Sequence, residues 1–146
     1  MRKIIFLLGI MGILASCSPK VTGVSQNYST ETEFVESIPT DADYALLHIY
    51  RSGLIGAAVG YDLYIGDALI CHVKNKMKET VKIDQEGLNT LWAKTESKTE
   101  LPINIQFGHE YYIKCSVKMG VVVGRPKLEI VDNKKGRSEY SAIKEK

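Results

Sequence analysis

The side chains best suited to chemistry in this chain are three cysteines and three histidines, spread over 146 residues. Cys71 and His72 are adjacent in the apolar run ALICHV, which has the composition of a strand. Successive side chains of a strand point to opposite faces, so this pair cannot form a thiol and its general base. Cys115 could meet His48, His72 or His109 in the fold, but it has no local sequence signature of a catalytic cysteine. We therefore expect no catalytic residue.

The histidines show no metal-binding pattern. His48, His72 and His109 lie far apart, whereas zinc sites usually draw several ligands from short helical or hairpin spacings. The acidic residues fall mostly in turns, so the paired carboxylates of a glycosidase would have to converge from separate strands. The run GVVVGRP (120–126) lacks the Gly-Lys-Ser/Thr ending of a phosphate-binding loop. The sequence predicts neither a metal nor another cofactor.

Cys17 stands in a different context, at the end of the apolar run that opens the chain. Two basic residues precede residues 4–14, a segment too short to span a bilayer but typical of a secretory signal. The run ends LASC (14–17), which resembles the lipobox of bacterial lipoproteins. In that class the thiol is acylated, with chains such as palmitate, and the peptide is cut before the cysteine. The resemblance implies a signal peptide at 1–16 and lipid attachment at Cys17; an ordinary signal peptide is the alternative.

Composition restricts the function of the remaining chain. Removing the first 16 residues leaves 130, enough for one domain with a real core. Two of the 19 basic residues are lost with the signal, so 17 basic residues face 17 acidic ones. A net charge near zero provides no field that would concentrate DNA or RNA, and we expect no nucleic-acid partner.

If Cys17 carries lipid, Cys71 and Cys115 remain. An envelope location permits a disulfide between them. Both are expected to face inward on strands, so the alternative is that they are small buried apolar residues. Sequence alone leaves the two possibilities open.

Residues 17–40 are predicted to be the lipidated cysteine and a flexible tether. The segment is rich in Ser, Thr and Glu and has no sustained periodicity. A flexible chain of this length extends roughly 25–30 Å, which keeps the domain near the membrane surface. No acidic cluster directly follows Cys17, which favours an outer-membrane anchor that faces the periplasm.

A period of two begins near Ala42 and predicts an all-β domain over 41–132. It is expected to be a single antiparallel β-sandwich of about seven to eight short strands. Pro102 places its strand at a sheet edge or beside a bulge. The tail, 133–146, is polar, and Ser138 is a candidate cap for a short helix through Lys144. The expected strands are 45–51, 61–65, 68–73, 80–84, 88–95, 101–107, 111–118 and 126–131.

Several patches in order resemble a family of uncharacterised bacterial lipoproteins, described as a domain of unknown function. They are IYRSG (49–53), GYDLYIGD (60–67), EGLNTLWAKT (86–95) and the segment 107–132. The family is similar to carbohydrate-binding-like and PEGA-like β-sandwiches. The usual Pro-Gly-x-His of the family is Glu86-Gly87-Leu88-Asn89 here, so a role built on that histidine does not carry over. The resemblance implies a fold and an envelope location, and it implies no activity.

Aromatic side chains give the best indication of a binding surface. Strand alternation places Tyr64, Trp92 and Tyr112 opposite the apolar faces of their strands, where exposed rings could stack on sugars. Arg51 ends the first strand and could donate paired hydrogen bonds. The alternative is that these rings cover the second face of the sandwich, with their polar atoms at its rim. Val121–Val123 would form a contact patch if exposed.

These observations favour a non-enzymatic, lipid-anchored binding or scaffolding module of the cell envelope. Its partner would be an envelope protein or an envelope glycan, and the N-terminal lipid would hold it to the membrane. The alternative is an enzyme or accessory subunit with a site in the loops at one end, where Arg51, His109 and a carboxylate would converge in a pocket. A structural subunit of a larger complex is a third possibility.

Overall fold

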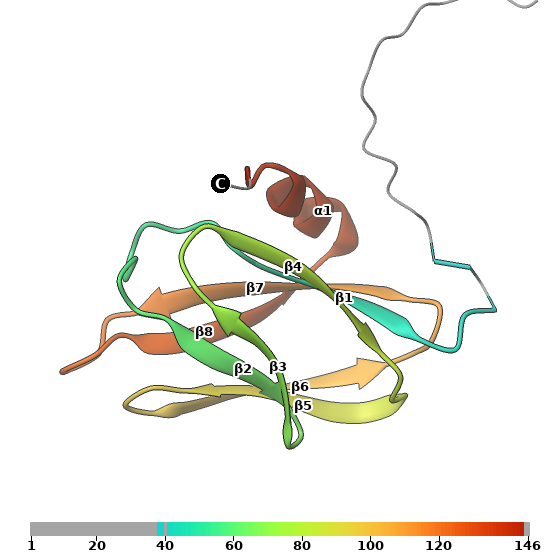
Figure 1. The fold of residues 1–146 in the computed structure, drawn as a ribbon, viewed down its shortest axis with the longest axis horizontal. Helices are drawn as coiled ribbons and strands as arrows, with labels where there is room; N and C mark the ends of the chain where they lie inside the picture. Colours follow the sequence, from blue (N-terminus) through green and yellow to red (C-terminus); the bar gives the residue numbers. More distant parts are fainter. Residues whose placement is uncertain (1–37, 40, 145–146) are drawn as a thin grey trace, which may run out of the picture. The chain divides into compact units, whose positions relative to one another are not determined.

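The computed structural model describes residues 38–39 and 41–144. The signal peptide, Cys17 and nearly all of the tether lie outside the described residues. The described part consists of eight strands followed by one helix (Figure 1). The elements are β1 (Ala45–Arg51), β2 (Tyr61–Ile65), β3 (Ala68–Val73), β4 (Met77–Ile83), β5 (Gly87–Lys94), β6 (Lys98–Ile105), β7 (Glu110–Lys118), β8 (Arg125–Val131) and α1 (Asn133–Ser141).

The strands form two four-stranded sheets, ordered β4-β1-β7-β8 and β3-β2-β5-β6, packed face to face. The predicted all-β sandwich is confirmed. One strand pair departs from the antiparallel expectation, because β1 and β7 pair in parallel, with Leu46 opposite Glu110. Successive strands alternate in direction through short turns. Two odd-numbered strands that become neighbours must therefore run the same way.

The core lies between the sheets and is built by alternation along each strand. Leu47, Ile49, Leu63, Leu91 and Ile105 are completely buried there. Burial of each such side chain stabilises the fold by about 1.5–3 kcal/mol. The two buried clusters lie between Ala45 and Ile143, so the chain that follows Cys17 contains the described core in full.

Strands β4 to β8 differ from their predicted bounds, most of them by one residue, and the largest differences are in β4 and β6. Strand β4 begins at Met77 rather than 80, and β6 spans 98–105 rather than 101–107. In β6 the pairing with β5 extends to Lys98, which lies opposite Lys94. The polar residues 98–100 have no apolar alternation, so the sequence pattern did not include them in the strand. Strand β6 is an edge strand, as the proline at 102 predicted.

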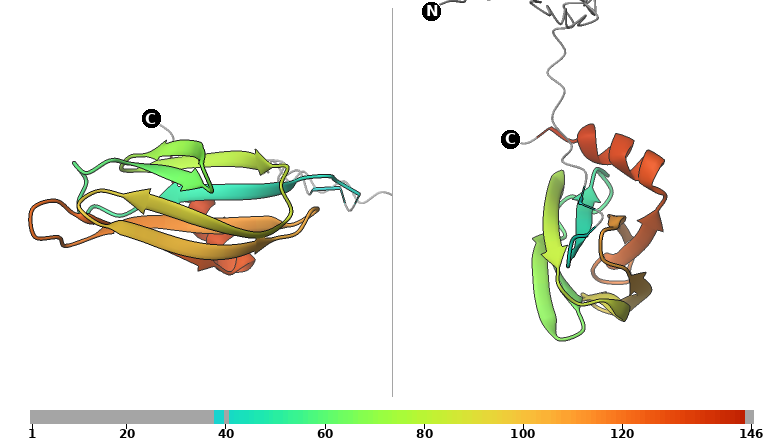
Figure 2. Two further views of the ribbon diagram at one scale, coloured as in Figure 1. Left: turned by 90° about the horizontal axis from the view of Figure 1, so that it is seen from below. Right: turned by 90° about the vertical axis from the view of Figure 1, so that its right-hand side faces the viewer.

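The tail predicted to be polar forms α1, which lies against the outer face of the sheet β4-β1-β7-β8 (Figures 1 and 2). The predicted cap was wrong. Asp132 caps the helix, because its side-chain oxygen accepts a hydrogen bond from the backbone nitrogen of Lys135 at 3.0 Å. Ser138 lies inside the helix. Gly136 of the helix packs on Tyr112, and a Cβ at position 136 would overlap the tyrosine side chain.

Candidate functional site

The outer face of the sheet β3-β2-β5-β6 carries a row of aligned side chains. Tyr64 on β2 lies opposite Leu69 on β3 and Trp92 on β5, and Trp92 lies opposite Glu100 on β6. Directly paired residues of neighbouring strands point to the same side of the sheet. The row therefore crosses all four strands on the side away from the core. Leu69 is 58% exposed and Leu88, on the same face of β5, is 81% exposed.

Tyr64 and Trp92 form a stacked pair. Their ring centroids are 4.3 Å apart and the ring planes differ by 9°. The indole nitrogen of Trp92 donates to the carbonyl of Gly66 at 2.7 Å, and the ammonium of Lys98 lies 4.7 Å from the centroid of the indole. These contacts fix the pair on the surface as a rigid, partly exposed apolar plate with a cation beside it.

A polar pair lies on the same face as the aromatic pair. The Nδ1 atom of His72 is 2.6 Å from the Oδ1 atom of Asp62, and the two side chains are 62% and 47% exposed. The pair is cross-strand, because Asp62 lies opposite His72 in the register of β2 and β3. This part of the face offers exposed hydrogen-bonding groups next to the aromatic plate.

Tyr112 is not part of this surface, and its prediction as an exposed ring is corrected. It lies on the outer face of the other sheet, beneath α1, and is 2% exposed. Its ring stacks on His48 at 4.6 Å, and its hydroxyl donates to the carboxylate of Glu110 at 3.2 Å. Strand alternation placed the ring opposite the core correctly. It did not reveal that the helix covers that face.

The cluster beneath α1 was missed at the sequence level. His48 is buried, and its Nδ1 atom is 2.8 Å from the hydroxyl of Thr80. Burial lowers the pKa of His48 below its usual value, which favours the neutral ring. The hydroxyl of Tyr50 donates to the carboxylate of Glu139 on α1 at 2.8 Å. The cluster attaches the helix to the sheet. The one local sequence signal of this packing was Gly136, a glycine within the polar segment that forms α1.

Arg51 is fully buried, which corrects its prediction as a surface donor. Its guanidinium donates to the carbonyls of Val59 and Gly56, each at 2.6 Å. These acceptors belong to the loop 52–60 between β1 and β2. Arg51 therefore organises that loop from inside and is not available to a ligand on the surface.

The residues expected to converge for an enzyme site lie at opposite ends of the sandwich. Arg51 ends β1, whereas His109 precedes β7, which runs parallel to β1 and starts at the other end. The Nδ1 atom of His109 is 3.0 Å from the carbonyl of Phe107, within its own turn. The cluster of Arg51, His109 and a carboxylate is not formed.

Cys71 and Cys115 are both buried free thiols, so the disulfide left open by the sequence is not formed in this structure. Burial raises the pKa of each thiol to about 12, which disfavours the thiolate needed for nucleophilic attack. Cys71 faces the core and His72 faces solvent, as alternation required. Among residues 38–39 and 41–144, no three His, Cys, Asp or Glu side chains form a set that could hold a metal.

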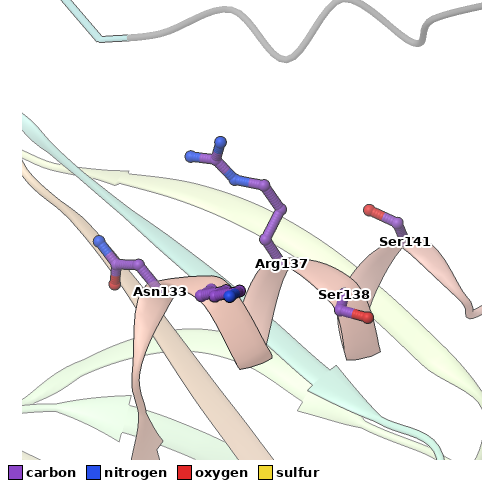
Figure 3. Close-up of a pocket in the computed structure, with 5 residues that line it drawn as sticks. Asn133, Arg137, Ser138 and Ser141 are labelled. Atoms are coloured by element: carbon purple, nitrogen blue, oxygen red, sulfur yellow. The ribbon is translucent and has the colours of Figure 1, made fainter.

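The surface pocket drawn in Figure 3 lies on the solvent side of α1. Its lining comes from one helix alone: Asn133, Lys134, Arg137, Ser138 and Ser141. A site with a single wall is a shallow depression rather than a cleft that could enclose a substrate.

The N-terminus matches the model of the prokaryotic membrane lipoprotein lipid attachment site over residues 1–18. The chain carries a lipoprotein attachment site. This match agrees with the prediction made from LASC (14–17) and indicates a lipid-anchored protein of the bacterial envelope. The matched residues lie outside the described part of the structure, and the match does not extend into the sandwich.

Most of the chain is also similar to an uncharacterized protein of Haemophilus influenzae (strain Rd). The two are 27% identical over 139 residues, which cover 94% of this chain and 80% of the relative. No solved structure matches the chain. The resemblance of the sandwich to carbohydrate-binding-like and PEGA-like domains stays a prediction. In the described residues, no helix has the length and apolar character needed to cross a bilayer.

Proposed function

We propose that this lipoprotein is a non-enzymatic binding or scaffolding module of the bacterial envelope, with the outer face of the sheet β3-β2-β5-β6 as its recognition surface. The observation that carries the proposal is the difference between the two outer faces. Helix α1 covers one of them, while the other presents the stacked pair Tyr64–Trp92 flanked by exposed Leu69 and Leu88.

The chemistry of this face suits an envelope protein or an envelope glycan. A rigid aromatic pair offers apolar area at little cost in side-chain entropy, and sugars stack on such rings. Asp62 and His72 provide hydrogen-bonding groups beside it. The neighbouring ammonium of Lys98 pairs with the carboxylate of Glu100 at 2.6 Å, so both charges border the aromatic pair. We propose that the anchored domain acts at the outer membrane and faces the periplasm, because no acidic cluster directly follows Cys17.

Photocrosslinking in cells tests the surface. A photoreactive amino acid replaces Leu88 on the outer face in the full-length lipoprotein. The matched control replaces Ser138, which is exposed on α1. We expect the probe at 88 to capture a defined envelope component and the probe at 138 to capture none. Equal capture patterns from both positions would contradict the proposed surface.

Co-sedimentation with peptidoglycan distinguishes a glycan partner from a protein partner. Leu88→Arg adds a charge to the proposed surface without touching the core, because the side chain is 81% exposed. If the partner is a glycan, the wild-type protein should sediment with purified peptidoglycan, and a smaller fraction of the Leu88→Arg protein should do so. If the partner is a protein, peptidoglycan should pellet neither, and Leu88→Arg should remove the species captured by a probe at Leu69, which is exposed on the same face. Protease protection in whole cells, lost after outer-membrane permeabilisation, tests the periplasmic location.

A further inference from the structure

Two uncharged apolar loops lie side by side at one end of the sandwich, on the left in Figure 1. The loop 52–60 connects β1 to β2, and the loop 119–124 connects β7 to β8. A Cβ on Gly124 would come within 3.6 Å of Val59, which shows how close the loops are. Their large exposed apolar side chains are Leu54 (72%), Ile55 (68%), Met119 (87%), Val121 (86%), Val122 (87%) and Val123 (42%).

Each loop is held in shape by one charged side chain. Arg51 donates to carbonyls of the loop 52–60 from inside the domain. The carboxylate of Glu96, in the turn between β5 and β6, accepts hydrogen bonds from the backbone nitrogens of residues 121, 122 and 123 at 3.0–3.2 Å. It also pairs with Arg125 at 2.7 Å. With their polar backbone groups engaged, the loops present their apolar side chains outward.

The charges of the domain are divided between its two ends. At the end with the apolar loops, the connecting residues 52–60, 74–76, 95–97 and 119–124 contain a single acidic residue, Glu96, which is already paired. Apart from the buried Arg51, the basic residues of these connections and their adjoining strand ends are Lys74, Lys76, Lys94, Lys98, Lys118 and Arg125. Lys98 pairs with Glu100 and Arg125 pairs with Glu96. The connections at the opposite end contain Asp41, Asp43, Asp67, Asp84, Glu86 and Asp132.

We propose that this end, defined by the loops 52–60 and 119–124 and named here the loop end, binds an anionic phospholipid surface. Apolar side chains enter the headgroup region while the surrounding lysines attract lipid phosphates. Charge complementarity favours a lipid over a protein partner. The exposed apolar side chains match the acyl region of a bilayer, and the basic residues around them match its anionic headgroups. Contiguous exposed apolar side chains mark an interaction surface.

The attachment site brings the domain to such a surface. The 22 residues from Cys17 to Ile38 span at most about 75 Å when extended. The nine residues of β7 cover about 30 Å. The loop end is therefore within reach of the bilayer that holds the acyl chains, although β1 starts at the other end. Contact there would leave the outer face of the sheet β3-β2-β5-β6 open to a partner.

An environment-sensitive fluorophore on a single introduced cysteine tests the proposal. The acylated lipoprotein with Val122→Cys is labelled and reconstituted into vesicles of phosphatidylethanolamine and phosphatidylglycerol. Cys17 carries lipid, and Cys71 and Cys115 are buried, so the new thiol is the one labelled. Leu88→Cys is the matched control, because Leu88 (81%) and Val122 (87%) are similarly exposed apolar residues.

We expect a blue shift of the emission at 122 and none at 88, with the shift reduced in phosphatidylcholine vesicles or at high salt. In the unlipidated chain that starts at Ser18, Val121→Ser with Val122→Ser should weaken vesicle binding about tenfold, because less apolar surface leaves water. Lys118→Glu should weaken binding to anionic vesicles but not to neutral ones.

Three results would overturn the proposal. The first is a fluorophore at 122 that stays in water on the anchored protein. The second is an equal shift at 88, which indicates non-specific adsorption. The third is crosslinking from 122 to an envelope protein without any shift on lipid vesicles, which would assign the loop end to a protein partner. None of these results depends on the partner of the Tyr64–Trp92 face.

Discussion

Arg51 and Glu96 are charged side chains of opposite sign that shape the same end of the molecule. The first is fully buried and donates to neutral backbone carbonyls of the loop 52–60. The second is in a turn, and its carboxylate accepts hydrogen bonds from three backbone nitrogens and one guanidinium. Both use local charge to fix loops that lack charged side chains of their own. This arrangement makes each residue a sensitive point for the loop end.

Arg51→Lys should lower the free energy of unfolding by about 2–3 kcal/mol, because a single ammonium cannot reproduce the planar fork that reaches both loop carbonyls. Urea unfolding of the chain that starts at Ser18 measures the change. Lys94→Met, at an exposed position of β5, is the control and should stay within about 0.5 kcal/mol. If Arg51→Lys lowered the free energy of unfolding no more than this control does, the guanidinium would not be what holds the loop.

Glu96 predicts a pH-dependent contribution to stability. Hydrogen bonds from Arg125 and the loop nitrogens lower the pKa of Glu96 from 4.5 to about 2. The unfolded chain therefore binds this proton at a higher pH than the folded chain does. The stabilisation is complete above about 4.5 and is lost as the pH falls towards 2.

Unfolding of wild type and Glu96→Gln should thus differ at pH 7 and converge between pH 4.5 and 2. Amide exchange at residues 121–123 should be faster in Glu96→Gln at pH 7. A difference in stability that persists unchanged at pH 2 would show that the carboxylate charge is not the cause.

Helix α1 determines which outer face of the sandwich is open. Its buried side consists of Gly136, Tyr140 and the following Ile143, packed around Tyr50 and Tyr112. Glu139 on the helix also accepts from the hydroxyl of Tyr50 and pairs with Lys114 at 2.8 Å. The helix contributes a second, smaller cluster to the fold and removes two tyrosines from solvent.

Gly136→Ala should destabilise the domain by about 1–3 kcal/mol, since the new Cβ overlaps the side chain of Tyr112. Alanine otherwise favours helices by about 1 kcal/mol relative to glycine, so the sign of the effect distinguishes packing from propensity. Thermal unfolding checks it. Ser138→Ala, exposed on the same helix, is the control and should be neutral or slightly stabilising. A stabilised Gly136→Ala would mean that the helix does not pack as described.

The strands could be predicted from the sequence because their signal is local. Alternation in LPINIQF and YYIKCSVK gives the inward face directly, and β1 to β3 have the predicted bounds. The parallel pairing of β1 with β7 could not be predicted, since it joins segments about 65 residues apart. The helix was predicted with the wrong cap because Asp132 and Ser138 are both good N-cap residues, and packing of Gly136 decides between them.

The candidate site was predicted in part. Alternation placed Tyr64 and Trp92 on the outer face, where the structure stacks them. The same rule placed Tyr112 opposite the core but could not distinguish a face open to water from one beneath a helix. Arg51 was missed as a buried residue, because its partners are backbone carbonyls of a loop that has no sequence signature.

At the scale of the whole molecule, the two sheets enclose Cys71 on β3 and Cys115 on β7. A soluble form with Cys17→Ser should therefore show no thiol that reacts quickly with Ellman's reagent in native buffer, and two after denaturation. Burial and the raised pKa of both groups protect them while the sandwich stays closed. Zero thiols after denaturation without reductant would reveal a disulfide, and fast native reaction would reveal an open core.

The central position of β1 has a consequence for export. Its neighbour β7 emerges only after most of the chain has been delivered, so a partly translocated chain holds an apolar strand with one hydrogen-bonding edge empty. The long loop that must close before β1 and β7 meet makes this pairing slow and late. Maturation at the N-terminus can therefore proceed while the domain is still open, and a chain truncated before Glu110 has no route to a closed sandwich.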